Sequence, residues 1–549
     1  MQKLIIQLLV VFLPLLVAKA QQTMPEGVLD LNKPARLEWL QDAGFGMFIH
    51  FSFDSQLGTV ISHSVVGASD DYANRFFNEL PKSFNPRQWD PAEIAKLARL
   101  AGMKYIVLTT KHHSGFCLWD TQTTDFKITN TPYEKDLVAE YVEAVRAEGL
   151  AVGFYFSPED FHFLYRHDQT IRRRFPEPLP DELMDRYVEF TAIQITELMS
   201  NYGQVDVMFF DGGEGPLQET AKEVAWKHQP DLLVTRGAIN TPEQTVPGQA
   251  FKDPWEACIT MGTQWQYKPT NDDYKSATRM IEILIESRAK GGALLLNVGP
   301  KPDGALPVEQ ENRLREMAAW YFINQEAVQE VRPWIITNEE KIWFTRAKDD
   351  NTVFAYLTNM PDWPRGERRE IVIHSVKATD QTKVSVLGQN DLVVEYDPAA
   401  DATTRFEQQD DGLHISLVRA QRIYNNHKWH NPLVVKITNA EPALDPPFVQ
   451  TKGATLQNGL ITFEGELVDK GDARRVEAGF LYRPYAGFAE NLYDTNWKKT
   501  QTTTINKTDA YTIEVAKDQL EAGEYEYRAW IRHPRIDIYG DVKRIEVTK

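Results

Sequence analysis

The sequence predicts an α/β protein in which a TIM-like (β/α) barrel is followed by a β-sandwich and a C-terminal all-β module of the immunoglobulin or fibronectin type. First, from about residue 36 to residue 330, short apolar runs alternate with longer amphipathic segments, which is typical of parallel strands covered on both faces. Second, after Pro333 the helical periodicity gives way to short strand candidates separated by turn residues. Third, the 549 residues are too many for one core.

The predicted barrel elements alternate in chain order. Continuous apolar runs predict buried strands at residues 46–52, 104–110, 151–157, 205–211, 232–237, 257–262 and 293–299. Apolar residues at helical spacing predict helices at residues 91–101, 137–148, 182–201, 218–228, 275–290 and 307–323. Seven or eight such units fit a closed barrel better than an open sheet, and we expect this domain to span residues 21–332.

The remainder of the chain reads as two β-sheet domains. For residues 333–441 we expect a sandwich with strands at 342–346, 353–358, 369–374, 382–387, 414–417 and 433–438. The proline-rich stretch 442–447 is the predicted linker. For residues 448–549 we expect a second sandwich module with strands at 454–467, 477–482, 511–515 and 525–531.

The N-terminus has the pattern of a secretory signal peptide over residues 1–20. Lys3 supplies the positive charge, residues 4–17 the apolar run, and Ala18-Lys19-Ala20 a small-x-small cleavage site. We therefore expect an exported protein, periplasmic or secreted, without a membrane span, because the apolar run is too short to cross a bilayer. The net charge of −18 argues against nucleic acid and anionic membrane surfaces as partners.

The chain has two cysteines, Cys117 and Cys258. Both follow or lie in predicted barrel strands, so a single disulfide is one interpretation. Two buried free thiols are the favoured one, because an exported protein of this size with two cysteines is not a disulfide scaffold. Neither cysteine has a CxxC partner, which argues against a thiolate metal site.

Asp211 is the leading candidate for a catalytic nucleophile. It ends the predicted strand 205–211, and the carboxyl ends of parallel barrel strands are where such folds place their chemistry. Gly212 and Gly213 follow it and allow a sharp turn that leaves room for a ligand. The alternative interpretation is an aspartate that caps the next helix.

A second acid would complete a glycosidase pair. Glu256 is the preferred acid/base, since Pro254 and Trp255 could desolvate its carboxyl group and raise its pKa. The competitor is Glu243, which lies on the preceding predicted loop. Both assignments stay open at this stage.

Three histidines also lie near predicted strand ends, His50 in the last part of the first strand and His112-His113 after the second. Neutral imidazoles that bind sugar hydroxyls are the favoured interpretation, and a three-histidine metal site of a metallohydrolase is the alternative.

Three further residues are candidates for substrate binding. Tyr155 and Arg236 lie at or near strand ends, and a charge in the apolar run around Arg236 needs a partner. Trp265 could form an aromatic wall for a sugar or could simply pack in the core.

Taken together, these motifs resemble glycoside hydrolase family 29, the retaining α-L-fucosidases. The resemblance is carried from about residue 36 to residue 330 by GMFIHF at 46–51, TKHHSGF at 110–116, FFDGG at 209–213, WEAC at 255–258 and LLNVGP at 295–300. It implies a TIM-like barrel, hydrolysis of terminal α-L-fucosyl residues from oligosaccharides or polysaccharides, and no metal or organic cofactor.

Carried over by position, the resemblance makes Asp211 the nucleophile and His50, His112 and His113 ligands of fucose hydroxyls. Tyr155, Arg236 and Trp265 match further pocket residues, whereas the acid/base, Glu256 or Glu243, is the variable element of the family. A retaining enzyme for a related sugar such as an α-L-galactoside, and a non-catalytic carbohydrate-binding barrel, are the alternative functions.

Overall fold

The computed structural model describes residues 30–548 apart from 174–177, 214, 360–362, 365, 395–396, 421–430 and 486–495. The predicted signal peptide, residues 1–20, lies outside the described residues.

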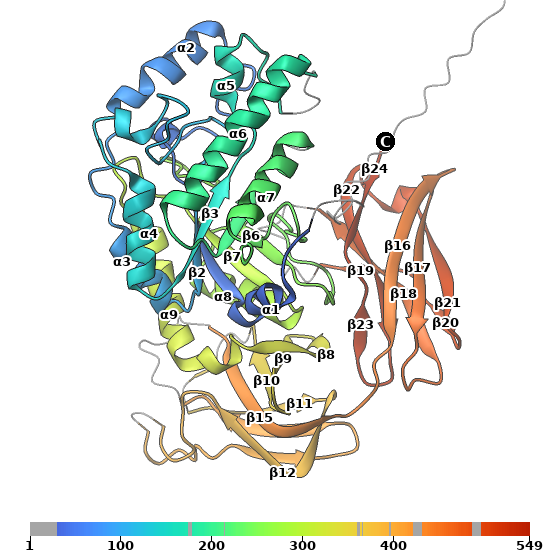
Figure 1. The fold of residues 1–549 in the computed structure, drawn as a ribbon. Coiled ribbons are helices and arrows are strands. Elements are labelled where there is room, and N and C mark those ends of the chain that lie inside the picture. Colours follow the sequence, from blue (N-terminus) through green and yellow to red (C-terminus); the bar gives the residue numbers. More distant parts are fainter. Residues whose placement is uncertain are drawn as a thin grey trace, which may run out of the picture.

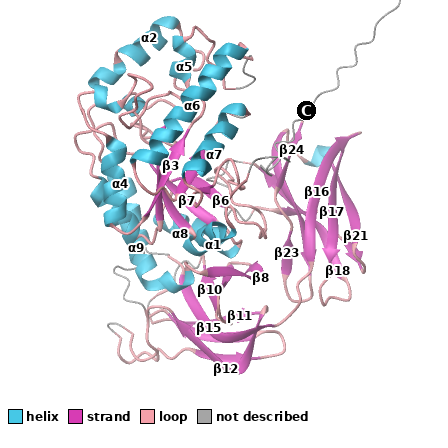
Figure 2. Cartoon of the chain, in the orientation of Figure 1, coloured by secondary structure: helices cyan, strands magenta, loops and turns pink. Residues whose placement is uncertain are grey.

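In the described part of the chain, the N-terminal region contains seven parallel strands in the order β5-β4-β3-β2-β1-β7-β6 (Figures 1 and 2). These strands are β1 Phe45–Ile49, β2 Tyr105–Lys111, β3 Ala151–Phe156, β4 Val207–Phe210, β5 Leu233–Val234, β6 Glu256–Thr260 and β7 Ala293–Val298. The predicted parallel barrel-like architecture is confirmed, and each strand lies within two residues of its predicted start.

The sheet closes through an irregular segment. β5 has two residues, and no ladder among the described residues joins it to β6. Instead, the chain after β5 runs beside β6, with parallel bridges from Asn240 to Trp255 and from Glu243 to Cys258. The backbone N–H of Cys258 donates to the Pro242 carbonyl at 3.0 Å. An extended loop therefore occupies the place where an eighth strand would complete the barrel.

Helices surround this sheet on its outside and at its two ends (Figure 2). They are α1 Pro34–Ala43, α2 Asp70–Asn78, α3 Pro91–Leu100, α4 Leu137–Ala147, α5 Phe161–Arg166, α6 Asp181–Asn201, α7 Pro216–His228, α8 Ala277–Ala289 and α9 Val308–Asn324. The side chains of Asp90 and Asp136 accept backbone N–H groups at the starts of α3 and α4, which fixes where these helices begin. The helices α1, α2 and α5 were not predicted from the sequence.

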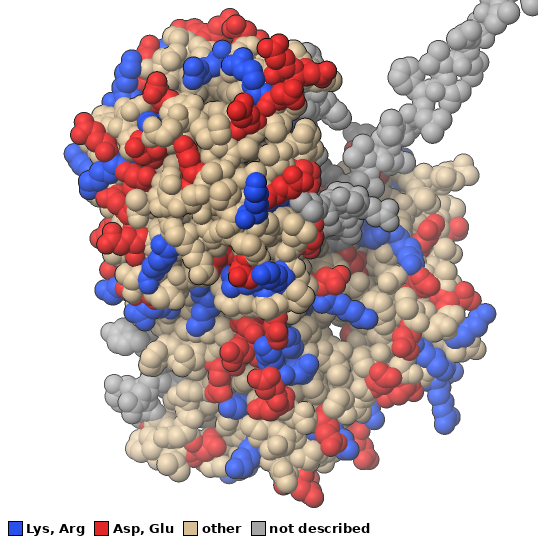
Figure 3. All heavy atoms as spheres, viewed as in Figure 1, with Lys and Arg blue, Asp and Glu red and all other residues tan. Residues whose placement is uncertain are grey.

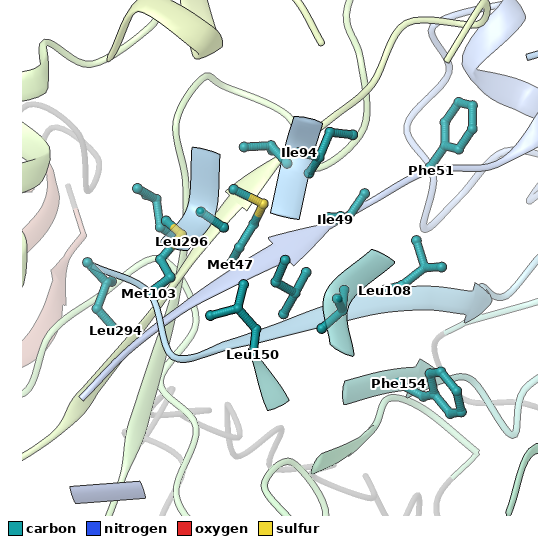
Figure 4. Close-up of a cluster of buried hydrophobic side chains, with 14 of the residues drawn as sticks. Met47, Ile49, Phe51, Ile94, Met103, Leu108, Leu150, Phe154, Leu294 and Leu296 are labelled. Carbon is teal, nitrogen blue, oxygen red and sulfur yellow. The ribbon is translucent and has the colours of Figure 1, made fainter. Parts of the chain in front are cut away.

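Both faces of the barrel sheet are buried. Along β1, Met47 and Ile49 pack with helix residues such as Ile94, in the layer that Figure 4 shows. Phe48, between them, belongs to a separate cluster inside the sheet with Tyr155 and other strand residues. Two apolar layers on opposite faces explain why the strands read as continuous apolar runs rather than as alternating ones.

After α9 the chain forms antiparallel sheets. A five-stranded sheet and a three-stranded sheet share one apolar core and contain β8 Val331–Glu339, β9 Ile342–Ala347, β10 Val353–Leu357, β11 Arg368–Ile373, β12 Val376–Val386, β13 Arg405–Gln408, β14 Leu413–Val418 and β15 Leu433–Pro442. This is the first sandwich, at the bottom of Figure 1.

The C-terminal sandwich lies beside the barrel in Figure 1. Its described strands are β16 Phe448–Gln457, β17 Leu460–Asp469, β18 Val476–Pro484, β19 Lys498–Lys499, β20 Thr503–Ile505, β21 Asp509–Ala516, β22 Gly523–Arg532, β23 Asp537–Tyr539 and β24 Lys543–Val547. The single strand predicted at 454–467 is wrong. It is a hairpin of β16 and β17, and it turns at Asn458 and Gly459, where φ is 49° and 75°.

Acidic and basic side chains are interspersed over the face that Figure 3 shows, so on this face the negative net charge forms no single patch. Among the described residues, no helix combines the length and the apolar character needed to cross a membrane. Cys117 and Cys258 are both buried and free, which confirms the favoured interpretation.

Candidate active site

Asp211 is held from both sides at the carboxyl end of β4. Arg236 Nη1 donates to Asp211 Oδ1 at 3.0 Å, and the Tyr155 hydroxyl donates to Oδ2 at 2.9 Å. His113 Nε2 lies 3.6 Å from the same Oδ2, and the carboxylate side chain remains 22% exposed. The carboxylate is thus oriented by two hydrogen-bond donors, Arg236 and Tyr155, while one part of it faces open space.

These neighbours keep Asp211 ionised. Burial alone would raise the pKa of its carboxyl group, but Arg236, His113 and the hydrogen bond from Tyr155 together lower the pKa well below the usual value. An ionised carboxylate that is partly exposed at a strand end can attack an electrophilic carbon.

The three predicted histidines surround this carboxylate in one aromatic cluster. The ring of His112 stacks on Tyr155 at 5.0 Å, and the ring of His50 lies 4.9 Å from Trp265 and 5.6 Å from His112. The structure therefore brings together His50, His112, His113, Tyr155, Arg236 and Trp265, all of the predicted binding residues.

Hydrogen bonds fix which ring nitrogen of each histidine carries the proton. Asn297 Nδ2 donates to the Trp265 carbonyl at 2.6 Å, so its Oδ1 accepts from His50 Nδ1 at 2.6 Å. The His50 Nε2 atom is therefore an acceptor.

The neighbouring histidines, His112 and His113, carry their protons on different ring nitrogens. The backbone N–H of His113 donates to His112 Nδ1 at 2.8 Å, which places the proton of His112 on Nε2. Ser157 Oγ donates to the Glu159 carbonyl at 2.8 Å and accepts from His113 Nδ1 at 2.6 Å, which leaves a lone pair on His113 Nε2. The cluster presents both donors and acceptors, as hydroxyl groups require.

All three imidazoles are neutral. Burial lowers the pKa of His50 and of His113 to about 3, and it also lowers the pKa of His112 well below the usual value. Neutral rings keep the mixture of donors and acceptors across the ordinary working range of pH.

The metal-site alternative takes a different form in the structure. Among the described residues, the ligand atoms of His112, His113 and Asp211 lie within 4.8 Å of one another, whereas His50 is not part of this group. The guanidinium of Arg236, 3.0 Å from Asp211, already supplies the positive charge that a cation would bring there. The group reads better as a hydroxyl-binding cluster.

Glu243 is the second carboxylate of the site. Arg236 Nη1 contacts Glu243 Oε2 at 3.1 Å as well as Asp211 Oδ1 at 3.0 Å. One nitrogen atom thus bridges two carboxylate oxygens, which lie no more than about 6 Å apart, close to the ~5–5.5 Å of retaining glycosidases. The Glu243 side chain is 43% exposed, so it can meet both a substrate and water.

The structure does not place Glu256, which the sequence favoured as the acid/base, beside Asp211. Glu256 is the first residue of β6, so it lies at the amino end of the sheet, opposite to the end that carries Asp211. It is fully buried, and Oε1 accepts from the hydroxyl of Tyr105, the first residue of β2, at 2.5 Å. A buried acid beneath the site cannot protonate a leaving group above it.

The environment of Glu256 predicts a pH effect on stability. Burial raises its pKa to about 7, so between about pH 4.5 and pH 7 the folded protein keeps a proton that the unfolded chain has lost. The free energy of unfolding should therefore fall as pH rises through this range. Relative to Glu256→Gln, we expect a fall on the order of 3 kcal/mol, measured by urea denaturation at several pH values.

Glu256→Gln is the matched reference because the amide keeps the shape of the acid and does not titrate. Other raised carboxyl groups, such as Asp54 and Glu282, are present in both proteins and cancel in the difference. Identical pH dependence in the two proteins would contradict this assignment.

A buried ion pair supports the His112-His113 loop. Lys111 Nζ contacts Asp160 Oδ2 at 3.0 Å, and neither side chain is more than 2% exposed. The Asp160 side chain also caps α5, and the next residue, Phe161, donates its N–H to the His113 carbonyl at 2.7 Å. The loop that carries the two histidines is thus tied to α5.

Three residues of the site were not predicted from the sequence. Asn297 orients His50, as described above, and Glu159 lies 3.5 Å from His113 Nδ1 and 3.3 Å from Arg173. Glu159 lies three residues after the end of β3, at the same end of the sheet as Asp211, and this signal could have identified it. Arg173 had no such signal, because it lies on an irregular segment before α6.

The chain resembles known α-L-fucosidases in sequence. A family model described as Alpha-L-fucosidase matches residues 12–326. Plasma alpha-L-fucosidase of Homo sapiens is 29% identical over 372 residues, which are 59% of this chain and 76% of that protein. Alpha-L-fucosidase of Dictyostelium discoideum is 27% identical over 403 residues, which are 65% of this chain and 86% of that protein.

Solved structures agree. Alpha-L-fucosidase isoenzyme 1 from Paenibacillus thiaminolyticus is 28% identical with a TM-score of 0.59, over 74% of this chain and 99% of that one. Alpha-fucosidase of Thermotoga maritima, solved with a mechanism-based inhibitor, is 25% identical with a TM-score of 0.58, over 73% and 96% of the two chains. The family model covers more than half of this chain, which therefore belongs to the α-L-fucosidases of glycoside hydrolase family 29 and is a glycoside hydrolase.

Proposed function

We propose that the protein is an exo-acting, retaining α-L-fucosidase that removes terminal α-L-fucosyl residues from fucosylated oligosaccharides or polysaccharides. The observation that carries the proposal is the sharing of the Arg236 guanidinium by Asp211 and Glu243, which keeps their contacting oxygens no more than about 6 Å apart, below the roughly 6.5–9.5 Å of inverting enzymes. Asp211 is the proposed nucleophile, and Glu243 takes the place of Glu256 as the proposed acid/base.

In the first step an oxygen of Asp211 attacks the anomeric carbon of the fucosyl unit. The bond from this carbon to the leaving oxygen breaks, and Glu243 transfers its proton to that oxygen. A covalent fucosyl ester of Asp211 forms with inverted configuration.

In the second step Glu243 accepts a proton from water, and the water oxygen attacks the same carbon. The ester bond breaks, the Asp211 carboxylate is restored, and the second inversion gives net retention. While the ester exists Asp211 carries no charge, so Arg236 then acts as the counter-ion of Glu243 alone.

The hydroxyl groups of the sugar are matched by the histidine cluster. His50 Nε2 and His113 Nε2 are acceptors, and His112 Nε2 is a donor. Trp265, beside His50, supports an apolar wall for one face of the ring.

The proposal predicts hydrolysis of p-nitrophenyl α-L-fucoside with α-L-fucose as the first product. Proton NMR, recorded before the product mutarotates, identifies the anomer. The matched comparator is p-nitrophenyl α-L-galactoside, which differs only at C6. The two substrates differ by one hydroxyl group at C6, and an apolar pocket rejects an added hydroxyl by on the order of 100-fold, so we expect the fucoside to be preferred by roughly 10-fold or more in kcat/KM.

Each other outcome excludes one part of the proposal. Formation of the β anomer first would indicate inversion and contradict the carboxylate pair. Preference for the galactoside would assign the related sugar instead. Turnover of neither aryl glycoside, nor of a panel of fucosylated oligosaccharides, would indicate a carbohydrate-binding barrel without catalysis.

A further inference from the structure

The loop that carries Glu243, residues 240–251 (the Glu243 loop), is fixed at its start by β6. Gln244 donates its backbone N–H to the Cys258 carbonyl at 3.0 Å, and its side chain donates to Thr260 Oγ1 at 3.1 Å. Gln244 has a φ of 54°, a left-handed conformation that is unfavourable for a non-glycine residue. The position of Glu243 therefore depends on contacts that hold this conformation.

The second half of the Glu243 loop leaves the barrel and meets the C-terminal sandwich. The backbone N–H of Gly248 donates to Asp541 Oδ1 at 2.7 Å, across 293 residues of sequence. A Cβ atom at Gly248 would lie 2.5 Å from the backbone nitrogen of Val542, so only glycine permits this approach. From the barrel side, Lys290 Nζ donates to the Pro247 carbonyl at 2.5 Å.

The turn that carries Asp541 is itself fixed. It joins β23 to β24, and the N–H of Gly540 donates to the Ala529 carbonyl in β22 at 2.9 Å. Lys543 Nζ, just after the turn, donates to the Lys452 carbonyl in β16 at 2.7 Å. β23 and β24 both pair with β22, so Asp541 is presented by a braced connection between two segments on one edge of that strand.

The C-terminal sandwich is also anchored to the first sandwich. Ile536, which is 6% exposed, packs in the apolar core of β8 to β15, and Arg535 Nη1 donates to the Ala443 carbonyl at 3.1 Å. Figure 1 shows the sandwich lying alongside the barrel. The connection between β23 and β24 can therefore act as a fixed support for a loop of the barrel.

From these contacts we infer that Asp541 is a positioning residue for the reaction, through which the C-terminal sandwich holds the Glu243 loop in its active conformation. The inference rests on the proposed function, in which Glu243 is the acid/base. Asp541 acts through the backbone of Gly248, whose N–H it accepts.

The test compares Asp541→Ala with Asp541→Asn in the full-length protein. Asp509→Ala is the control, because Asp509 lies on β21 of the same sandwich in an exposed pair with Lys507. Two readouts are measured. One is kcat/KM on a fucosyl disaccharide and on 2,4-dinitrophenyl α-L-fucoside, whose good leaving group needs no proton. The other is hydrogen exchange of the amides in residues 244–251.

We expect Asp541→Ala to lower kcat/KM on the disaccharide by roughly 10- to 100-fold and to spare the dinitrophenyl substrate. Exchange of the Gly248 amide should accelerate. Asp541→Asn keeps an oxygen acceptor and should behave like the wild type, as should Asp509→Ala. A general loss of stability would lower kcat/KM on both substrates in parallel.

Unchanged exchange in residues 244–251 of Asp541→Ala would overturn the inference whatever the activity shows. So would equal losses on the two substrates. Glu243→Gln, assayed in the same way, tests the proposed function separately. If Glu243→Gln loses the disaccharide activity and Asp541→Ala does not, the inference alone fails, whereas full activity of Glu243→Gln removes the acid/base assignment.

Discussion

Replacement of Asp211 by glycine should lower kcat on p-nitrophenyl α-L-fucoside by roughly four to six orders of magnitude, the scale of losses at nucleophilic residues. The side chain that would form the ester is removed, while Arg236 keeps Glu243 and the Thr241 hydroxyl as partners. The fold should persist, because Asp211 lies at the rim of the sheet and is partly exposed. Steady-state rates and circular dichroism of the purified variant measure both points.

Azide provides a second measurement on the same variant. The space left by the carboxylate admits a small anion, which attacks the anomeric carbon as p-nitrophenolate leaves and gives the β-fucosyl azide. Asp231→Gly, which removes an exposed partner of Lys33, is the control and should keep full activity. Residual turnover above about a tenth of the wild-type rate in Asp211→Gly would refute its role as nucleophile.

Substitution of Glu243 by glutamine should separate substrates by their leaving groups. A disaccharide needs a proton on its leaving oxygen, so its kcat/KM should fall by roughly 10²- to 10⁴-fold, the usual contribution of a general acid. The kcat/KM for 2,4-dinitrophenyl α-L-fucoside, which reports the first step, should fall less than about 10-fold. Glutamine can still accept from Arg236, so the guanidinium stays in place.

Glu256→Gln is the matched variant for this test, since it makes the same chemical change on the other carboxyl group. We expect nearly wild-type kcat/KM on both substrates, because Glu256 is fully buried at the amino end of β6. The reverse result, a selective loss in Glu256→Gln and none in Glu243→Gln, would restore the assignment that the sequence first favoured.

The barrel strands could be predicted from sequence because each is buried on both faces. A strand such as β2, with all of its residues buried, reads as a short continuous run of apolar residues, whereas the neighbouring helices show a helical period. Asp211 and the histidines follow from the same fact, since residues just after parallel strands converge at one end of the sheet.

What could not be predicted is where irregular backbone goes. The two-residue strand β5 gives no sign in the sequence that the segment from Asn240 to Glu243 runs beside β6 and brings Glu243 to Arg236. Glu256, in contrast, was placed at the wrong end although its position before the strand 257–262 carried the information. The helix α1 was missed because it begins with Pro34 after Lys33, without a side-chain cap. The helix α5 has six residues, too few to show a period.

Closure of the barrel by a loop rather than by an eighth strand has a consequence for how such enzymes can be changed. A strand has a fixed register, so insertions within it would disturb the whole sheet, whereas a loop can gain or lose residues between its anchors. The carboxylate on this segment can therefore shift along the chain between homologues while the nucleophile stays in place. For the same reason the segment is a natural unit for transplantation between barrels to alter linkage preference. Because the backbone of Gly248 is hydrogen-bonded to Asp541, however, a graft taken from this protein would have to carry β22, β23 and β24 with it.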